Sequence, residues 1–184
     1  HQATLDAQRQ LIAPYGFAEL DYSACRVPQE WIQNSPEQAL SHDYALIRLP
    51  STHAFGKKLG YFGLTPIGPE LDATLVQYPS YYLYGYPVNS PPPGWLPGMP
   101  GWAAGPLQSF QGNRVNYLID MTRGQSGGPL FYQYGAEPDG TPKVGILAIN
   151  HYESTVSNTA VVIRPTIFER LVRWRDETQL VLQS

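Results

Sequence analysis

The sequence is poor in cysteine, in charge and in long apolar runs. Cys25 is the only cysteine among 184 residues, so no disulfide can close within the chain and no zinc site built on cysteine pairs is available. Charged residues make up 15%, and a net charge of −3 provides no basic surface for nucleic acid. No stretch approaches the roughly 18 to 20 apolar residues of a membrane span, and no signal-type segment opens the chain. Nucleic acid and membranes are therefore not expected partners.

Tyrosine, glycine and proline are abundant instead. The chain holds 13 Tyr, 17 Gly and 18 Pro, and 42% of its residues are hydrophobic. Tyrosine suits half-buried pleated surfaces, whereas glycine and proline mark turns. The length allows one sizeable core or two small cores that share an interface. This composition predicts an all-β protein with long loops.

Short alternating or apolar runs between turn clusters predict strands along most of the chain. The predicted strands are 16–27, 44–49, 74–78, 82–86, 105–110, 115–119, 129–134, 144–149 and 158–163. A T-x-x-E capping box at Thr166 and Glu169, followed by apolar residues at helical spacing, predicts a helix at the C-terminus. The segment 89–102 is rich in Pro and Gly, so we expect a long surface loop there.

The hexapeptide GQSGGP at 124–129 allows three interpretations. It satisfies the G-x-S-x-G pattern of the α/β-hydrolase nucleophile elbow, but a β-type run follows Pro129 where that fold needs a helix. It also fits the nucleophile loop of a chymotrypsin-type protease, in which the amides of Gly124 and Ser126 would form the oxyanion hole. The third interpretation is a plain turn whose serine caps backbone groups.

An aspartate stands directly before a hydrophobic run in HDYALIRL. Asp43 is therefore a candidate for the acid that orients a catalytic histidine, although a simple capping role is equally typical of aspartate. Ser126 follows Asp43 by 83 residues, in the order that chymotrypsin-like enzymes use. A further predicted strand at 144–150 is a candidate wall of the specificity pocket and a partner for substrate backbone.

Several stretches resemble the glutamyl endopeptidase branch of the chymotrypsin-type serine proteases, the staphylococcal and bacillar enzymes: YLIDMTRGQSGGPLF, DYALIRL, VGILA, PYGFAELDY, RVPQEWI, LGYFGL and LYGYP. The resemblance implies two packed six-stranded antiparallel β-barrels, a site in the cleft between them and a C-terminal helix. It also implies a secreted, extracellular serine endopeptidase that hydrolyses a polypeptide substrate through an acyl-enzyme. Ser126 would be the nucleophile and Asp43 the acid, and the chemistry requires no cofactor or metal.

Domain boundaries follow from the same resemblance. We expect residues 1–72 to form the remainder of the N-terminal barrel, which carries the acid. Residues 73–165 would form the C-terminal barrel, which carries the serine, and 166–178 the helix. The first strands of the N-terminal barrel are expected to be missing from this chain.

The general base has no clear candidate among the four histidines. The short apolar-small-small-His stretch that normally carries it in this family is absent. His42 would point away from Asp43 on a strand, so we expect a surface or structural role. His53 is expected in a loop, and His151 in a loop or a substrate subsite. His1 has a compatible spacing to the acid without the apolar context.

We therefore expect the base to lie upstream of residue 1, with His1 as the alternative. An incomplete barrel would expose edges and core, so the missing strands should be physically present. The hypothesis is a two-chain molecule in which a separate N-terminal chain supplies the histidine and these strands. That chain would be bound non-covalently or through Cys25.

The positions that would bind a glutamate side chain differ from the family pattern. Glutamate-specific members have a histidine on the pocket strand and a threonine five residues before the serine. The matching residues here are Leu147 and Met121, which cannot pair with a carboxylate. Arg123 is close to these positions in sequence and could supply a positive charge, but the sequence does not show which way its side chain points. With Met121, Leu147 and Ala148 as substrate-binding residues, we expect an apolar or mixed preference at the residue before the cleaved bond.

A catalytically silent homologue that binds protein is the rival hypothesis. The absent histidine favours it, whereas the serine loop and acid favour the enzyme. A dense aromatic group would supply a contact surface or pack in the core: Tyr78, Tyr81, Tyr82, Tyr84, Tyr86, Trp95 and Trp102.

Overall fold

The structure is a computed structural model that describes residues 20, 22–49, 55–87, 100–153 and 156–180. Residues 16–19 and 21 of the predicted strand 16–27 and residues 89–99 of the predicted loop 89–102 lie outside the described residues. The described part of the first segment contradicts the predicted strand, because Tyr22–Ala24 form a 3-10 turn and Arg26 makes only an isolated β-bridge. Within the described ranges, no helix has the length and apolar character needed to cross a membrane.

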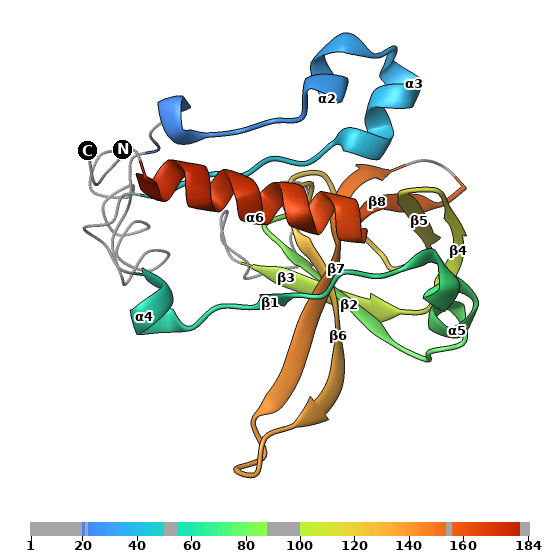
Figure 1. Cartoon of the computed structure of the whole chain (residues 1–184). Coiled ribbons are helices and arrows are strands. Elements are labelled where there is room, and N and C mark those ends of the chain that lie inside the picture. The colour runs from blue at the N-terminus through green and yellow to red at the C-terminus, as the bar shows by residue number, and fades with distance from the viewer. Residues whose placement is uncertain (1–19, 21, 50–54, 88–99, 154–155, 181–184) are drawn as a thin grey trace, which may run out of the picture.

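Antiparallel strands dominate the C-terminal two-thirds of the chain and curl into a half-barrel (Figure 1). In chain order the strands are β2 Tyr81–Gly85, β3 Gly101–Gly105, β4 Leu107–Gln111, β5 Arg114–Tyr117, β6 Pro129–Ala136, β7 Pro142–Glu153 and β8 Asn158–Val162. Their order in space is β3-β2-β6-β7-β8-β5-β4, and the short β1 (Gly63–Leu64) pairs in parallel with β7. The β6–β7 hairpin extends beyond the sheet as a long arm (Figure 1).

Six of the predicted strands are confirmed in this sheet. They correspond to β2, β4, β5, β6, β7 and β8. Alternation is the physical reason in β2, where Tyr81 and Leu83 are fully buried and Tyr84 is exposed. The end of the predicted loop 89–102 is strand instead, because β3 begins at Gly101 and pairs with β2 along its whole length.

The predicted strand 74–78 is wrong, since this segment is helical. The short α5 (Asp72–Val76) follows the 3-10 turn η4 (Pro69–Leu71) without a break. Pro69 occupies the first helical position, and Glu70 and Asp72 bring negative charge to helix starts. These helix-initiating residues outweigh the β-type residues that follow them.

The N-terminal half is made of short helices and extended segments. The helical elements are η1 Tyr22–Ala24, α2 Gln29–Gln33, α3 Pro36–Ala39, η2 Leu40–His42 and α4 Phe55–Leu59. The predicted strand 44–49 forms only an isolated bridge, in which Arg26 and Leu46 exchange two backbone hydrogen bonds of 2.9 Å. A strand needs a partner along its length, and within the described residues this segment finds one at Arg26 alone.

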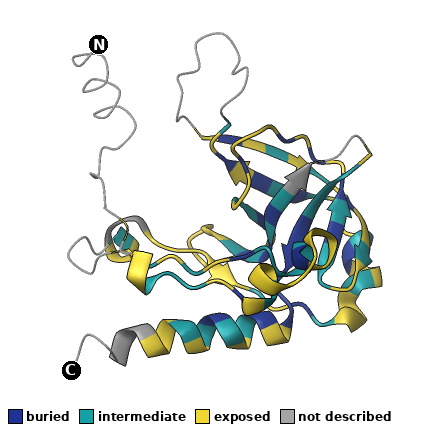
Figure 2. Ribbon diagram, turned by 90° about the horizontal axis from the view of Figure 1, so that it is seen from above, coloured by how far each residue is buried: buried dark blue, intermediate teal, exposed yellow. Residues whose placement is uncertain are grey.

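The C-terminal helix is confirmed as α6 (Pro165–Leu180). It begins one residue before the predicted capping box, because the Arg164 carbonyl accepts the amide of Phe168 and Thr166 already lies in the first turn. Buried residues of α6 face the sheet (Figure 2), with Ile167 and Leu171 packed in one cluster with Val161 of β8.

A buried arginine ties the start of α6 to the rest of the fold. Arg164 is almost fully buried and forms a bidentate ion pair with Asp72 at 2.7 and 2.8 Å. Its remaining donors reach the carbonyls of Gly112 and Ile67. The positive charge of Arg164 is thus paired with a carboxylate and its nitrogens are hydrogen-bonded, as burial of a charge requires.

Candidate active site

The serine loop 124–129 leads into β6, at the end of the segment that connects β5 to β6, in a conformation that only glycine adopts easily. Gly124 and Gly127 have φ angles of 100° and 83°. A Cβ on Gly128 would lie 2.2 Å from the Tyr84 carbonyl oxygen, so no side chain fits there. The sequence GQSGGP is therefore what lets this loop turn sharply and pack its backbone against β2.

A buried asparagine holds the loop from β7. The Asn150 carbonyl accepts the amide of Gly127 at 2.7 Å, and the Asn150 amide donates to the Gly128 carbonyl at 2.9 Å. The fully buried side chain donates from Nδ2 to the Gln125 carbonyl at 2.9 Å and accepts the phenol of Tyr117 at Oδ1. Burial raises the pKa of Tyr117, which keeps its phenol protonated as a donor.

Gln125 closes the loop from the other side with a neutral side chain. Its side-chain Oε1 accepts the backbone amide of Thr122 at 2.7 Å, while its backbone amide donates to the Thr122 carbonyl. Within the described part of the chain, the amides of Gly124 and Ser126 donate no backbone hydrogen bond. These are the two donors expected to bind an oxyanion.

Asp43 caps the C-terminal end of η2 and is held in place by the residue that follows it. Tyr44 is buried against the ring of Trp174 in α6, with centroids 6.1 Å apart, and its hydroxyl accepts a bond from Arg170 at 3.0 Å. Arg170 in turn forms a bidentate pair with Glu30 at 2.7 and 3.0 Å. Asp43 itself keeps 35% of its side chain exposed.

His151 of β7 contacts both sequence-predicted residues. Its Nδ1 lies 3.4 Å from Oδ2 of Asp43, and its carbonyl accepts the Ser126 hydroxyl at 3.3 Å. The imidazole is only 2% exposed, and its Nε2 lies 3.1 Å from Oγ1 of Thr159. The sequence indicated a loop or subsite residue here, whereas the structure has it on a strand beside the acid.

Asp43 and Ser126 line the same hollow, whose volume is about 300 Å³. The residues around it are Val27, Trp31, Asp43, Tyr44, Ala45, Ile47, Ser126, Gly127, Ile149, Asn150 and His151. Residues 83 apart in the sequence are thus brought to one concave surface between the N-terminal segments and the sheet. Within the described residues, the hydroxyl of Ser126 bonds a carbonyl and no histidine ring.

The other histidines do not enter the hollow or lie outside the described residues. His42 belongs to η2, so the expectation that strand geometry turns it away from Asp43 is wrong. Its Nδ1 is buried and has no hydrogen-bond partner among the described residues. His1 and His53 lie outside the described residues. In the part of the chain that is described, no group of three His, Cys, Asp or Glu side chains has the arrangement of a metal site.

The three predicted substrate-binding residues lie in the hydrophobic core. Leu147 and Ala148 are fully buried, and Met121 is 6% exposed. The hollow beside Ser126 is lined by the next residues of β7, Ile149 to His151. Arg123 is exposed on the serine loop side of the molecule. The pairing of Pro129 with Ile149 sets this register, which the sequence pattern alone did not give.

The comparisons with known proteins agree with the resemblance found in the sequence. No protein-family model matches the chain. The glutamyl endopeptidase of Bacillus licheniformis is 23% identical over 167 residues, which cover 90% of this chain and 48% of that protein. A solved structure of a Glu endopeptidase in complex with MPD superposes with a TM-score of 0.63 at 18% identity, covering 89% of this chain and 66% of the other.

The chain therefore resembles the glutamyl endopeptidases in sequence and has their chymotrypsin-type fold. It spans about half the length of the curated relative that it matches.

Proposed function

We propose that this chain carries the nucleophile and the acid of a chymotrypsin-type serine endopeptidase. The hydroxyl of Ser126 attacks the carbonyl carbon of a peptide bond while a histidine removes its proton. The tetrahedral oxyanion accepts bonds from the amides of Gly124 and Ser126. The amine leaves with the proton from the histidine, and water then hydrolyses the acyl-enzyme. Asp43 orients the histidine and stabilises its cation.

The single observation that carries this proposal is the shared hollow. Asp43 and Ser126 come from distant parts of the sequence and line one depression on a chymotrypsin-type fold. A plain glycine-rich turn gives no reason for an acid to face it across a concave surface. The glycine conformations support the same chemistry, and so do the amides of Gly124 and Ser126, which donate no backbone hydrogen bond among the described residues.

The general base is proposed to come from outside the described residues. Asp43 and Ser126 both line the hollow, whose volume is about 300 Å³. A histidine on a segment upstream of residue 1 is the first candidate, and His1 is the second. His151 is a poorer base because both of its ring nitrogens already face Asp43 and Thr159.

The proposed upstream segment would also cover apolar surface. Val27, Trp31 and Ile47 line the hollow and are between 39% and 55% exposed. Such side chains suit burial beneath the remaining strands of a first β-barrel, and the two-barrel architecture is proposed for the complete protein on this basis. The half-buried Cys25 offers a route for a covalent link between the two chains. We further propose that the complete protein is secreted, like other proteases of this type.

The residue preference at the cleaved bond is proposed to be apolar or mixed. Leu147 and Met121, which match the carboxylate-binding positions of glutamate-specific enzymes, are apolar and buried. A buried glutamate side chain would find no compensating charge beside them.

Active-site labelling tests the proposal. The complete protein, including its upstream segment, is incubated with a fluorophosphonate, and the modified peptide is mapped by mass spectrometry. Ser126 should be labelled, Ser126→Ala should abolish labelling, and Ser109→Ala should not. Labelling that survives in Ser126→Ala would contradict the assignment, and a fully folded wild type that never reacts would favour the silent homologue.

A further inference from the structure

The environment of His151 is built to orient its ring. The imidazole is buried between Asp43 of the N-terminal half and Thr159 of β8, with polar atoms facing both nitrogens. Nδ1 lies at ion-pair distance from the Asp43 carboxylate without hydrogen-bond geometry, and a proton on Nδ1 suits this neighbour because an ionised carboxylate only accepts. In the neutral ring Nε2 is then an acceptor, and the hydroxyl of Thr159 donates to it. One tautomer therefore satisfies both neighbours.

The backbone explains why this side chain leaves the sheet. Asn150 pairs with Ala160 and Tyr152 pairs with Thr159, with a register shift between them. His151 is therefore the extra residue of a β-bulge, a feature that re-aims a side chain and is common beside active sites. The bulge directs the ring toward Asp43 while the strand on both sides stays hydrogen-bonded to β8.

The same residue also contacts the nucleophile. The carbonyl of His151 accepts the hydroxyl of Ser126, so one position of β7 contacts the acid through its ring and the serine through its backbone. The acid belongs to a segment with a single isolated bridge, whereas the serine loop is fixed to the sheet at Gly127 and Gly128. The buried ring of Tyr44 anchors the neighbouring backbone, and the contact with His151 is what links the Asp43 carboxylate itself to the sheet.

We propose that His151 is a positioning residue that fixes the Asp43 carboxylate relative to Ser126. This inference rests on the proposed function. The Nδ1 side of the ring holds Oδ2 of the carboxylate by close contact, the other carboxylate oxygen is left for the catalytic base, and His151 takes no proton from the serine. The hydroxyl of Thr159 holds the ring at Nε2.

Three substitutions separate this role from its alternatives. In His151→Asn, the side-chain nitrogen takes the place of Nδ1, whereas in His151→Gln it extends toward the place of Nε2. His151→Ala removes both. In the complete protein, His151→Ala should lower kcat for peptide hydrolysis by about 100-fold because the acid is displaced. KM should be unchanged, since substrate binding is not involved. His151→Asn should recover most of the lost activity, and His151→Gln should not.

Other results would overturn the inference. Wild-type kcat in His151→Ala would mean that Asp43 is held without it. Complete loss in all three variants would make His151 the general base, and an effect confined to KM would make it a substrate-binding residue.

A second measurement does not depend on activity. Long-range 1H–15N spectra of the His151 ring should show a protonated Nδ1 that shifts in Asp43→Asn and not in Asp120→Asn. If wild type is inert to the fluorophosphonate yet this shift is observed, the proposed function fails while the His151–Asp43 contact stands. A ring that is insensitive to Asp43→Asn overturns the inference whatever the activity.

Discussion

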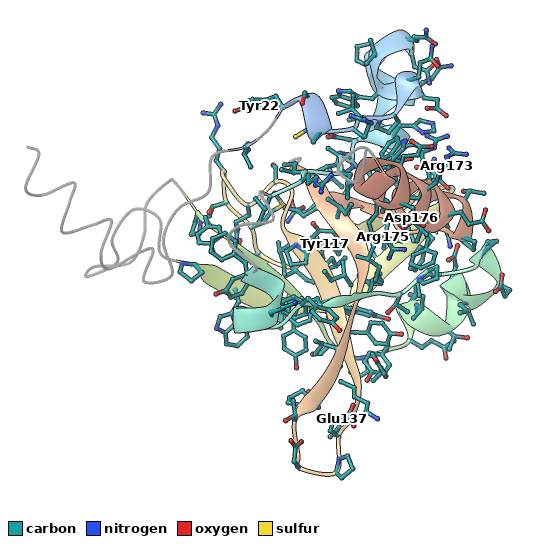
Figure 3. The ribbon with its side chains drawn as sticks, turned by 60° about the vertical axis from the view of Figure 1, so that its left-hand side comes forward. Tyr22, Tyr117, Glu137, Arg173, Arg175 and Asp176 are labelled. Atoms are coloured by element: carbon teal, nitrogen blue, oxygen red, sulfur yellow. The ribbon has the colours of Figure 1, made fainter. Side chains whose placement is uncertain are left out.

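Replacing Asn150 by alanine should loosen the serine loop and destabilise the protein together. Asn150 is fully buried beside the loop, and its side chain links the Gln125 carbonyl to the phenol of Tyr117 (Figure 3 labels Tyr117 among the strands). Its backbone bonds to Gly127 and Gly128 do not depend on the side chain. The substitution therefore removes one half of the attachment and leaves the other.

The expected cost follows from the two side-chain bonds. The bond from Nδ2 to Gln125 is worth about 1 kcal/mol. The Gln125 carbonyl keeps a bond from the amide of Gly128, so its loss is partly compensated. The phenol of Tyr117 is left buried with no acceptor, which costs about 1–3 kcal/mol more. We expect a loss of about 2–4 kcal/mol in the free energy of unfolding.

Urea denaturation measures this loss, and the fluorophosphonate labelling rate of Ser126 measures the effect on the loop. Removing both partners in Asn150→Ala/Tyr117→Phe should recover part of the stability, because no hydroxyl is left unpaired. Asn116→Ala is the matched control, since its amide bonds Ser109 at an exposed position and should matter by less than about 0.5 kcal/mol. If Asn150→Ala is as stable as Asn116→Ala, the buried bonds do not hold the loop.

Three further predictions concern the fold around the site. Arg164→Ala should lower the free energy of unfolding, measured by urea denaturation, by about 3–5 kcal/mol, because it leaves the Asp72 carboxylate without its positively charged partner. A loss below about 1 kcal/mol would contradict this. Gly128→Ala should greatly slow labelling of Ser126, since its Cβ would meet a β2 carbonyl at 2.2 Å, whereas Gly63→Ala has open space and should label normally. The hydrogen bond and charge of Arg170 hold the pKa of Glu30 below its usual 4.5, so this pair stabilises the fold at neutral pH and loses its contribution as the pH falls through that lowered value. Glu30→Gln should therefore melt below wild type at pH 7 and together with it in strong acid; an equal difference at both pH values would refute the reasoning.

The sequence carried enough information for the sheet and for the two residues at the hollow. Alternating runs predict strands with one buried face, such as β2, and continuous apolar runs predict strands buried on both faces, such as β8. GQSGGP predicts a turn that only glycines permit. The order and spacing of Asp43 and Ser126 resemble a known protease family, and the structure brings both to one hollow. Their catalytic roles stay predictions.

Local signals in conflict account for one error. The segment around 72–78 has β-type residues, and it also has a proline and acidic residues at the helix starts. The second set of signals decided the outcome, and giving it more weight would have found α5. The prediction of a strand at 44–49 was wrong for another reason. Residues of high strand propensity form a strand only where a partner strand lies alongside.

Long-range contacts account for what the sequence did not reveal. Nothing near Asn150 indicates that its side chain holds a loop 25 residues earlier. The contact between His151 and Asp43 joins two halves of the molecule and depends on a bulge whose position is set by pairing with β8. The burial of both Leu147 and Ala148 likewise depends on the tertiary structure, because neighbouring residues of β7 point to opposite faces and both faces are covered here.

The central claim is that Ser126 becomes acylated during peptide hydrolysis. The most direct measurement is intact and peptide-level mass spectrometry of the complete protein, quenched in acid during turnover of an activated peptide ester. The account predicts an acyl adduct on Ser126 that forms in wild type and is absent in Ser126→Ala. An adduct on another residue, or hydrolysis that proceeds at the wild-type rate in Ser126→Ala, would contradict it.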